Sequence, residues 1–396
     1  MKDYMMRSED FKSSIKIKPL KFDLKEVPHV TIEPNKTCNI KCRSCYSLER
    51  THVKSLDDVK KEIDLATHKR NLETITLLGG EPTLHPELIE IIKYIKCMRL
   101  KCQLLTNGIV FLEDTDDQLL DEIAHSKIDR ILLHVDIGQE HIHRDIDQIR
   151  NILFSKFEYR KIHFALSLTI FEENKGSISS LLKRYAHYKY FDGILAVLAR
   201  DPDHELAVQP ELLDEYESIH NQLDIEPTNY IPFNLDDKYI SWLIYFYFIN
   251  ANSGKTYAIS PMQDRIFRKL YRLIKGHHLF ALILNPTLIK ISFILVTIIG
   301  LINHPIQYKN IFQVFRKSHY LQSIRLHFIV IQTPPEFNSE KNTYQFCYHC
   351  PDATIRNGQL TPVCIADRIN PLENSWAVDE IKQDLYRTAY EHLGNI

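Results

Sequence analysis

The sequence lacks three features that mark common protein classes. Residues 1–21 carry scattered charges and no apolar core, so we expect no secretory signal and a cytoplasmic, reducing compartment in which disulfides are disfavoured. The net charge is only −2, so no nucleic-acid partner is expected from molecule-wide attraction. The apolar run at residues 291–302 is shorter than the roughly 20 uninterrupted apolar residues of a membrane-spanning helix.

What the chain does contain is an alternation of short β-rich runs and helical runs. Strands are expected near residues 27–32, 74–78, 102–105, 131–135, 162–168 and 193–198, with helices between them. Six such units predict an α/β fold: a partial (β/α)6 TIM-like barrel of parallel strands. We predict a lead-in (1–26), the partial barrel (27–235), a helical, basic and apolar segment (236–335) and a Cys-rich extension (336–396).

Four motifs follow the first four predicted strands. They are Cys38-Asn-Ile-Lys-Cys42-Arg-Ser-Cys45-Tyr46, Gly79-Gly80-Glu81-Pro82, Thr106-Asn107-Gly108 and Asp136. Because the site of such a barrel lies at the C-terminal ends of its strands, we expect the motifs to meet there. Histidines at 134, 141 and 143 flank Asp136, and we interpret them as solvated or hydrogen-bonded side chains rather than metal ligands.

The three clustered thiols, Cys38, Cys42 and Cys45, predict a metal centre. Three thiolates in one short loop can hold three irons of a cubane cluster and leave the fourth iron open. A structural zinc site is the alternative, but zinc prefers a fourth protein ligand, and no further Cys or His lies close by in the sequence.

These motifs resemble those of the radical S-adenosylmethionine (radical SAM) superfamily, over roughly residues 27–200. Its C-x3-C-x2-C motif is matched by Cys38, Cys42 and Cys45, and its Gly-Gly-Glu motif by Gly79, Gly80 and Glu81. The resemblance implies a [4Fe-4S] cluster, S-adenosyl-L-methionine as cofactor, and a reductant such as flavodoxin or ferredoxin. It also implies that the Gly-Gly-Glu motif binds the methionine amino group.

Other cofactor contacts follow from the same resemblance. Asn107 lies in a turn familiar from the family, and Asp136 and Ser167 are placed where polar residues approach the ribose. Members usually have an aromatic residue just before the third cysteine, where this chain has Ser44; Tyr46 follows that cysteine instead. Adenine packing is therefore expected to differ in detail.

A second group of cysteines, Cys347, Cys350 and Cys364, lies near the C-terminus. The C-x2-C pair has a metal-binding spacing, and the Asn357-Gly358 turn would return the chain toward it. The segment resembles a shortened SPASM or twitch extension, which implies a second, auxiliary iron–sulfur cluster. Zinc remains an alternative, and the suggested fourth ligands are His349, Asp352, Asp367 and the substrate itself.

Residues 265–325 contain no Asp or Glu, although the chain has 51 acidic residues, and they include the apolar run at 291–302. One interpretation is a buried helical hairpin over the barrel mouth. The other is an apolar surface flanked by Lys and Arg that contacts anionic membrane headgroups from the cytoplasmic side. The second motivates the hypothesis of an apolar or lipid substrate.

Three functions are therefore compared. The first is a radical SAM enzyme acting on a C–H bond of an apolar molecule. The second is a radical SAM enzyme that modifies ribosomal peptides, for which residues 1–26 look too short to form a peptide-recognition unit. The third is a non-enzymatic metal-bearing scaffold at a membrane surface.

Overall fold

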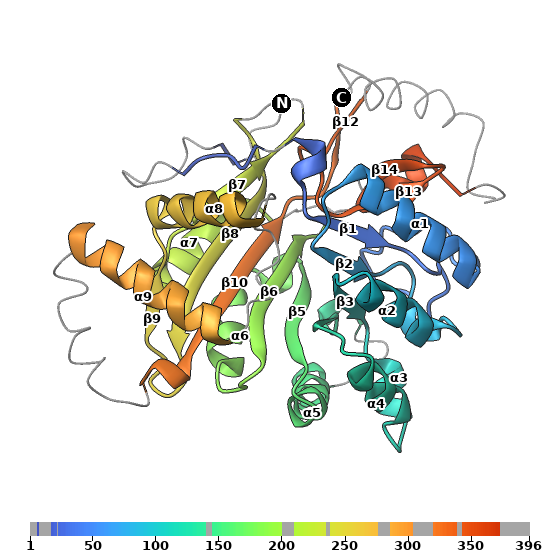
Figure 1. Ribbon diagram of the computed structural model, residues 1–396, viewed down its shortest axis with the longest axis horizontal. Helices are drawn as coiled ribbons and strands as arrows, with labels where there is room; N and C mark the ends of the chain where they lie inside the picture. Colours follow the sequence, from blue (N-terminus) through green and yellow to red (C-terminus); the bar gives the residue numbers. More distant parts are fainter. Residues whose placement is uncertain are drawn as a thin grey trace.

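The computed structural model of the protein shows a curved sheet whose outer face is covered by helices (Figure 1). The structure describes residues 6–7, 17–21, 23–139, 145–199, 210–234, 238–275, 286–303, 320–338 and 343–372. The strand order across the sheet is β1-β2-β3-β4-β5-β6-β10-β8-β7, and β9 pairs with β8.

Six parallel strands confirm the predicted partial barrel. The strands β1 to β6 pair in chain order, each parallel to the next. They are β1 (His29–Ile32), β2 (Thr74–Leu77), β3 (Lys101–Thr106), β4 (Arg130–Leu133), β5 (His163–Ile170) and β6 (Phe191–Leu198). The helices that follow them are α1 (Leu56–Lys69), α2 (Leu88–Cys97), α3 (Ile109–Glu113), α4 (Gln118–His125), α5 (Ile146–Tyr159), α6 (Ile178–Tyr185) and α7 (Leu212–Leu223).

Residues 236–335 were predicted to be helical, and this prediction was wrong for three parts of the segment, which form strands. They are β8 (Ile240–Asn250), β9 (Thr256–Ala258) and β10 (Ile324–Gln332), and β10 pairs parallel to β6 and antiparallel to β8. Every residue of β8 is buried, so its apolar and aromatic side chains do not alternate with polar ones. A continuous apolar run of this kind does not distinguish a buried strand from a buried helix.

Two apolar clusters lie on the two faces of the sheet. The outer cluster joins α1, α2 and α4 to α7 to one face, as expected when crossover helices cover a parallel sheet. The inner cluster includes Leu132, Ala165 and Phe328 from the other face and also the thiols of Cys347 and Cys350. Cys347 and Cys350 therefore lie against the inner side of the partial barrel.

Segments from both ends of the chain lie along the two edge strands, β1 and β7 (Asn229–Pro232). The Tyr348 amide donates to the Pro232 carbonyl over 2.8 Å, and Phe233 forms a bridge with Cys347. On the opposite edge, β13 (Ala353–Arg356) packs beside β1. The lead-in contributes too, since the Leu20 amide donates to the Tyr230 carbonyl over 2.7 Å. A short hairpin of β11 (Glu336–Asn338) and β12 (Thr343–Gln345) precedes this segment.

Two helices remain of the segment that was predicted to be helical: α8 (Pro261–Lys275) and α9 (Pro286–Asn303). They lie over the strands β8 and β10 in Figure 1, and Phe293 and Val296 of α9 are buried in the inner cluster. No helix among the described residues is long and apolar enough to cross a membrane. Residues 276–285, and Lys309, Arg316 and Lys317 of the basic stretch, lie outside the described residues.

Candidate functional site

The loop after β1 carries the first three cysteines. A backbone bridge between Asn35 and Val53 closes its base. Within it, Cys38 and Cys42 are half-buried and Cys45 is exposed. One side of the loop therefore faces the sheet edge, and the other is open toward solvent.

Two side-chain amides from neighbouring strand ends point at the thiols. Asn107 Nδ2 lies 4.0 Å from Cys38 Sγ, and Gln139 Nε2 lies 3.5 Å from Cys42 Sγ. Burial opposes ionisation of Cys42, but hydrogen bonds from His134 and Gln139 outweigh it and lower the pKa of this thiol. Burial raises the pKa of Cys38. Amide donors at sulfur are the contacts that stabilise thiolates in iron–sulfur sites.

Across the described residues, no set of three or more His, Cys, Asp or Glu side chains has the spacing of a metal site. The donor set nevertheless fits an iron–sulfur cluster. Three thiols share one loop, and the charges of Cys42 and Cys45 both act on Cys38. That these three thiols ligate a cluster stays a prediction, and so do the roles of the other predicted site residues.

The Gly-Gly-Glu turn packs directly against the cysteine loop. The Gly80 amide donates to the Asn35 carbonyl over 3.0 Å, and the Glu81 amide donates to the Thr37 carbonyl over 2.7 Å. A Cβ atom at Gly80 would lie 2.1 Å from the Thr37 oxygen, so no side chain fits there. Gly79 has φ +143, a conformation that side chains disfavour. Both glycines are therefore required by close backbone approach rather than by turn geometry alone.

The Glu81 carboxylate links the ends of β2 and β3. It accepts hydrogen bonds from the hydroxyls of Thr83 and Thr106, at 2.6 and 2.7 Å, and from the Asn107 amide at 2.7 Å. Burial raises the pKa of Glu81, and these hydrogen bonds partly offset that effect. A hydrogen-bonded carboxylate is thus held immediately beside the cysteine loop.

Asp136 follows β4, and Ser167 lies within β5, three residues before its end. The Asp136 carboxylate accepts hydrogen bonds from the Gly138 amide at 3.0 Å and the Thr169 amide at 2.7 Å, so it shapes this edge through the backbone. Ser167 is buried, and its carbonyl pairs with His134 Nδ1 at 3.0 Å. The hydrogen-bonded interpretation of His134 is confirmed, whereas histidines 141 and 143 lie outside the described residues.

Sequence reasoning missed two residues of this edge. Gln139 lies near Cys42, and Asn39 accepts a hydrogen bond from Asn107 Nδ2 at 2.7 Å. The spacing of Gln139, three residues after Asp136, was the available signal, but a single amide in a turn has no distinctive pattern. Tyr46 is half-buried, with Lys36 Nζ 5.8 Å from its ring centre.

The C-terminal cysteines lie at a hairpin of β13 and β14 (Gln359–Pro362). Its turn residues, Asn357 and Gly358, both have positive φ (47 and 78), which confirms the predicted two-residue turn. Burial raises the pKa of Cys347, Cys350 and Cys364, and the nearby Asp352 carboxylate raises all three further. Cys347 and Cys350 are buried together in the inner cluster, whereas Cys364 is half-buried, and Asp352 lies near all three thiols.

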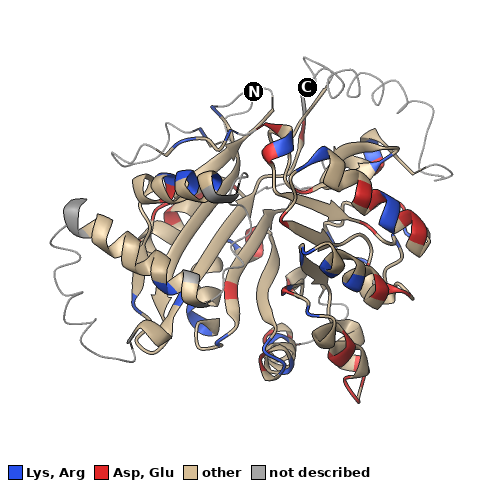
Figure 2. Cartoon of the chain, viewed as in Figure 1, with Lys and Arg blue, Asp and Glu red and all other residues tan. Residues whose placement is uncertain are grey.

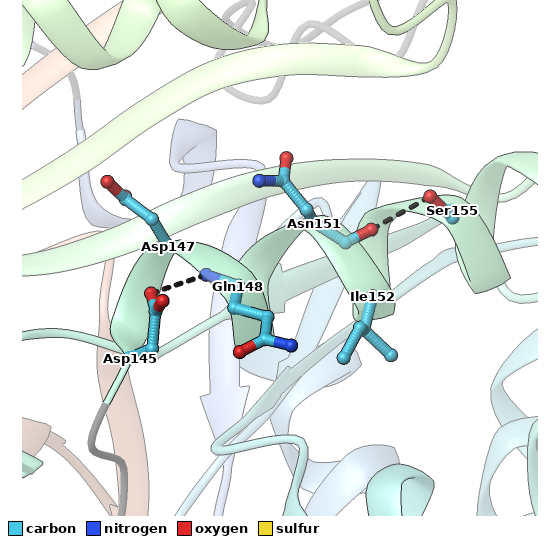
Figure 3. Close-up of a pocket in the computed structure, with 6 residues that line it drawn as sticks. All are labelled: Asp145, Asp147, Gln148, Asn151, Ile152 and Ser155. Atoms are coloured by element: carbon cyan, nitrogen blue, oxygen red, sulfur yellow. Dashed lines mark hydrogen bonds between the residues drawn. The ribbon is translucent and has the colours of Figure 1, made fainter.

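An open hollow on the surface of α5 lies apart from these groups. It is lined by Asp145, Asp147, Gln148, Asn151, Ile152 and Ser155 (Figure 3). The hydrogen bonds drawn there are local, because Asp145 caps the helix at the Gln148 amide (2.9 Å) and the Ser155 hydroxyl donates to the Asn151 carbonyl (2.8 Å). These contacts explain the helix start and add nothing to the cysteine loop.

The part of the chain that forms the cysteine loop and the neighbouring strand ends is similar to known proteins. Residues 32–157 match the model of the radical SAM superfamily. A predicted glycyl-radical enzyme activating enzyme of Methanocaldococcus jannaschii is 33% identical over 108 residues, which are 26% of this chain and 42% of that protein. The subtilosin biosynthesis protein AlbA of Bacillus subtilis is 33% identical over 90 residues, which are 22% of this chain and 20% of that protein.

The matched region spans less than half the length of these curated relatives. Among solved structures, Streptococcus suis SuiB bound to S-adenosylmethionine is similar with a TM-score of 0.40 and 17% identity, over 52% of this chain and 48% of that chain. The family match covers the cysteine loop, the Gly-Gly-Glu turn, Asn107 and Asp136, and it confirms the predicted family and its cofactors, a [4Fe-4S] cluster and S-adenosylmethionine. The similarity to the radical SAM superfamily therefore holds for residues 32–157, about a third of the chain.

Proposed function

We propose that the protein is a radical SAM enzyme whose cluster is held by Cys38, Cys42 and Cys45. The observation that supports this most strongly is the meeting of the cysteine loop, the Gly79–Glu81 turn and Asn107 at one edge of the sheet. When bound and reduced, by a carrier such as flavodoxin or ferredoxin, the cluster would supply the electron that cleaves S-adenosylmethionine to a 5′-deoxyadenosyl radical.

The chain's own residues would bind and orient the cofactor. The Gly79–Glu81 turn offers close backbone approach beside the loop, and it is the proposed contact for the methionine amino group. Asn107, Asp136, Ser167 and Tyr46 are the proposed surroundings of the nucleoside. The inner cluster beneath them would exclude water from a reactive intermediate.

The test is anaerobic reconstitution with iron and sulfide, followed by S-adenosylmethionine and a strong reductant. We expect 5′-deoxyadenosine from the wild type and none from Cys42→Ala. Cys97→Ala is a matched control, because this cysteine is exposed at the end of α2, and it should behave like the wild type. A wild type that carries the cluster and releases no 5′-deoxyadenosine, with candidate substrates present, would favour the non-enzymatic scaffold.

The substrate proposed first is an apolar or lipid molecule met at an anionic membrane surface. On α9, Ile291, Leu295 and Ile298 are 48%, 41% and 51% exposed, whereas Phe293 and Val296 are buried on its other side. Figure 2 shows α9 almost free of charged residues, and Lys and Arg dominate α8 beside it. An apolar face next to basic residues is typical of helices that lie in the headgroup region.

Flotation with vesicles of anionic lipid tests this surface at low salt. We expect the wild type to float with the vesicles and the double variant Ile291→Glu/Ile298→Glu to remain in the lower fraction. Ile152→Glu is the matched control, since Ile152 is 40% exposed on α5, away from α9, and should not alter flotation. Wild type that stays unbound would remove the membrane proposal.

Peptide modification is the second candidate. One relative is a bacteriocin biosynthesis protein, although the match covers only 20% of its length. Incubation with candidate precursor peptides and mass spectrometry would detect a mass change that depends on S-adenosylmethionine. Such a change, with no reaction on lipids, would replace the first substrate proposal.

For the C-terminal cysteines we propose a second iron–sulfur cluster, with Asp352 as the fourth ligand. The support is the geometry of the hairpin: β13 and β14 connect Cys350 to Cys364, and Asp352 lies between Cys350 and β13, where it accepts a hydrogen bond from Gln332 at 2.9 Å. Metal analysis of a Cys38→Ala/Cys42→Ala/Cys45→Ala variant isolates this site. Iron with sulfide supports the proposal, whereas one zinc per chain favours the zinc alternative.

A further inference from the structure

Four buried charged side chains join the cysteine loop to the C-terminal segment. They are Glu33, Lys36, Arg356 and Asp367, and each side chain is at most 5% exposed. Lys36 Nζ lies 2.9 Å from Glu33 and 3.0 Å from Asp367. The Arg356 guanidinium donates to both carboxylates, at 2.5 and 2.9 Å. Two positive and two negative charges balance, which is the condition under which buried charges are tolerated.

Asp367 also reaches the backbone of the cysteine loop itself. Its Oδ2 atom accepts hydrogen bonds from the Leu48 amide at 2.9 Å and the Glu49 amide at 3.4 Å. These amides follow Cys45 closely, on the half of the loop that is farther from β1. Asp367 lies in α12 (Ala366–Ile369), which follows Cys364 and the short helix η6 (Val363–Ile365). A residue from the end of the described chain therefore fixes the loop that carries Cys45.

The other half of the loop is fixed locally. The Asn35–Val53 bridge holds its base, and the Gly79–Glu81 turn holds residues 35–37. The segment around Cys45 and Tyr46 lies between these contacts and the Leu48 amide. Its conformation is held by hydrogen bonds to a buried carboxylate, which are stronger than those to a neutral group, and by the Arg50 guanidinium, which donates to the Ile40 carbonyl at 2.9 Å.

We propose that Asp367 is a positioning residue for the cysteine loop, and that the C-terminal segment thereby forms part of the radical SAM site. This inference rests on the proposed function. Asp367 touches neither the reacting atoms nor the cofactor, and it acts by holding Leu48 and Glu49, and with them Cys45 and Tyr46, in one conformation. Without this carboxylate, the spacing of the three cysteines in the sequence would be unchanged, but Cys45 would no longer be held in position relative to Cys38 and Cys42.

Amide hydrogen exchange of the full chain, purified without metal, gives a direct readout. In Asp367→Ala, the exchange of residues 46–50 should be about tenfold faster than in the wild type, because both backbone hydrogen bonds are lost. In Asp367→Asn, which keeps one acceptor oxygen, the increase should be smaller. After reconstitution, the spectrum of the reduced cluster should lose its response to S-adenosylmethionine in Asp367→Ala.

The matched control is Asp192→Asn, which breaks another buried ion pair, with Arg130 at 2.7 Å, away from the cysteine loop. It should lower stability and leave both the exchange of residues 46–50 and the spectrum unchanged. Unchanged exchange in Asp367→Ala, or equal effects in Asp192→Asn, would overturn the inference. If the wild-type cluster itself ignores S-adenosylmethionine, the proposed function fails, while the exchange experiment still decides the role of Asp367.

Discussion

At the scale of single residues, Gly80 shows how closely the site is packed. Its missing side chain leaves room for the carbonyl oxygens of Lys36 and Thr37, which would lie 2.3 and 2.1 Å from an added Cβ. Backbone atoms cannot rotate away as a flexible side chain can. The turn and the cysteine loop therefore fit together only with glycine at this position.

We predict that Gly80→Ala lowers the free energy of unfolding by about 1–3 kcal/mol, because the added Cβ displaces the loop backbone. It should also abolish iron–sulfur reconstitution at the cysteine loop. Gly254→Ala is the control: Gly254 has φ +67 and open space around it, so the substitution should cost about 1 kcal/mol and leave cluster binding intact. Urea denaturation and iron analysis measure both, and normal iron in Gly80→Ala would contradict the packing argument.

A second single-residue effect concerns Glu215 on α7. Its side chain is buried, and the Gly176 amide donates to Oε1 over 2.7 Å. Burial raises the pKa of Glu215 to about 7, from an ordinary value of 4.5. In the folded protein the protonated form is therefore favoured below about pH 7.

Because folding raises this pKa, protonation of Glu215 stabilises the folded protein relative to the unfolded chain. This contribution to stability is complete below about pH 4.5 and is lost as the pH rises through about 7. We predict that the wild type loses about 2–3 kcal/mol of stability between pH 5 and 8 relative to Glu215→Gln, which cannot ionise. Urea denaturation at several pH values measures the difference. Parallel profiles for the two proteins would show that Glu215 is not responsible.

At the scale of elements, α8 connects parts of the fold that are distant in sequence. Asp264 near its start accepts a hydrogen bond from Asn229 of β7 at 2.8 Å. Near its end, the Tyr271 hydroxyl donates to Glu73, just before β2, over 2.7 Å. The helix thus links β7 to the opposite side of the sheet.

We predict that Tyr271→Phe lowers the free energy of unfolding by about 1–2 kcal/mol, because a hydrogen bond to a carboxylate is lost. Tyr159→Phe is the control, since Tyr159 is 83% exposed, and it should have no effect. Thermal or urea unfolding distinguishes the two. Equal stability of both variants would mean that the α8 contact contributes nothing to the fold.

At the scale of the whole molecule, the buried charges at Glu33 and Asp367 connect the first strand to the C-terminal segment. Burial opposes ionisation of Glu33, but Lys36 and Arg356 outweigh it and lower its pKa to about 2. Because folding lowers this pKa, the ionised Glu33 carboxylate stabilises the folded protein. This contribution is complete above about pH 4.5, the ordinary pKa of the group, and is lost as the pH falls toward 2.

We therefore predict that the wild type is more stable than Glu33→Gln at pH 6, by about 3 kcal/mol, and that the difference shrinks as pH falls from about 4.5 toward 2. The protection factors of amides in β1 and β13, which are corrected for the intrinsic pH dependence of exchange, should fall together over the same range, since the network joins these strands. A difference that stays constant across this range would show that ionised Glu33 is not the stabilising group.

Much of the fold and part of the site could be predicted from local patterns. The six parallel strands, the hairpin turn at Asn357-Gly358 and the hydrogen-bonded state of His134 agree with the sequence analysis. These features depend on short-range periodicity and on residues with restricted backbone preferences. The strand β8 could not be predicted, because a continuous apolar run carries no period.

The sequence alone determined which chemistry the chain can carry: the spacing of Cys38, Cys42 and Cys45, and the family that residues 32–157 match. Ligand spacing within one loop is a local property of the chain. Only the tertiary structure decided what surrounds that loop. Gln139 and Asp367 reach it from 97 and 319 residues away, and hydrogen bonds across such separations leave no periodic trace in the sequence.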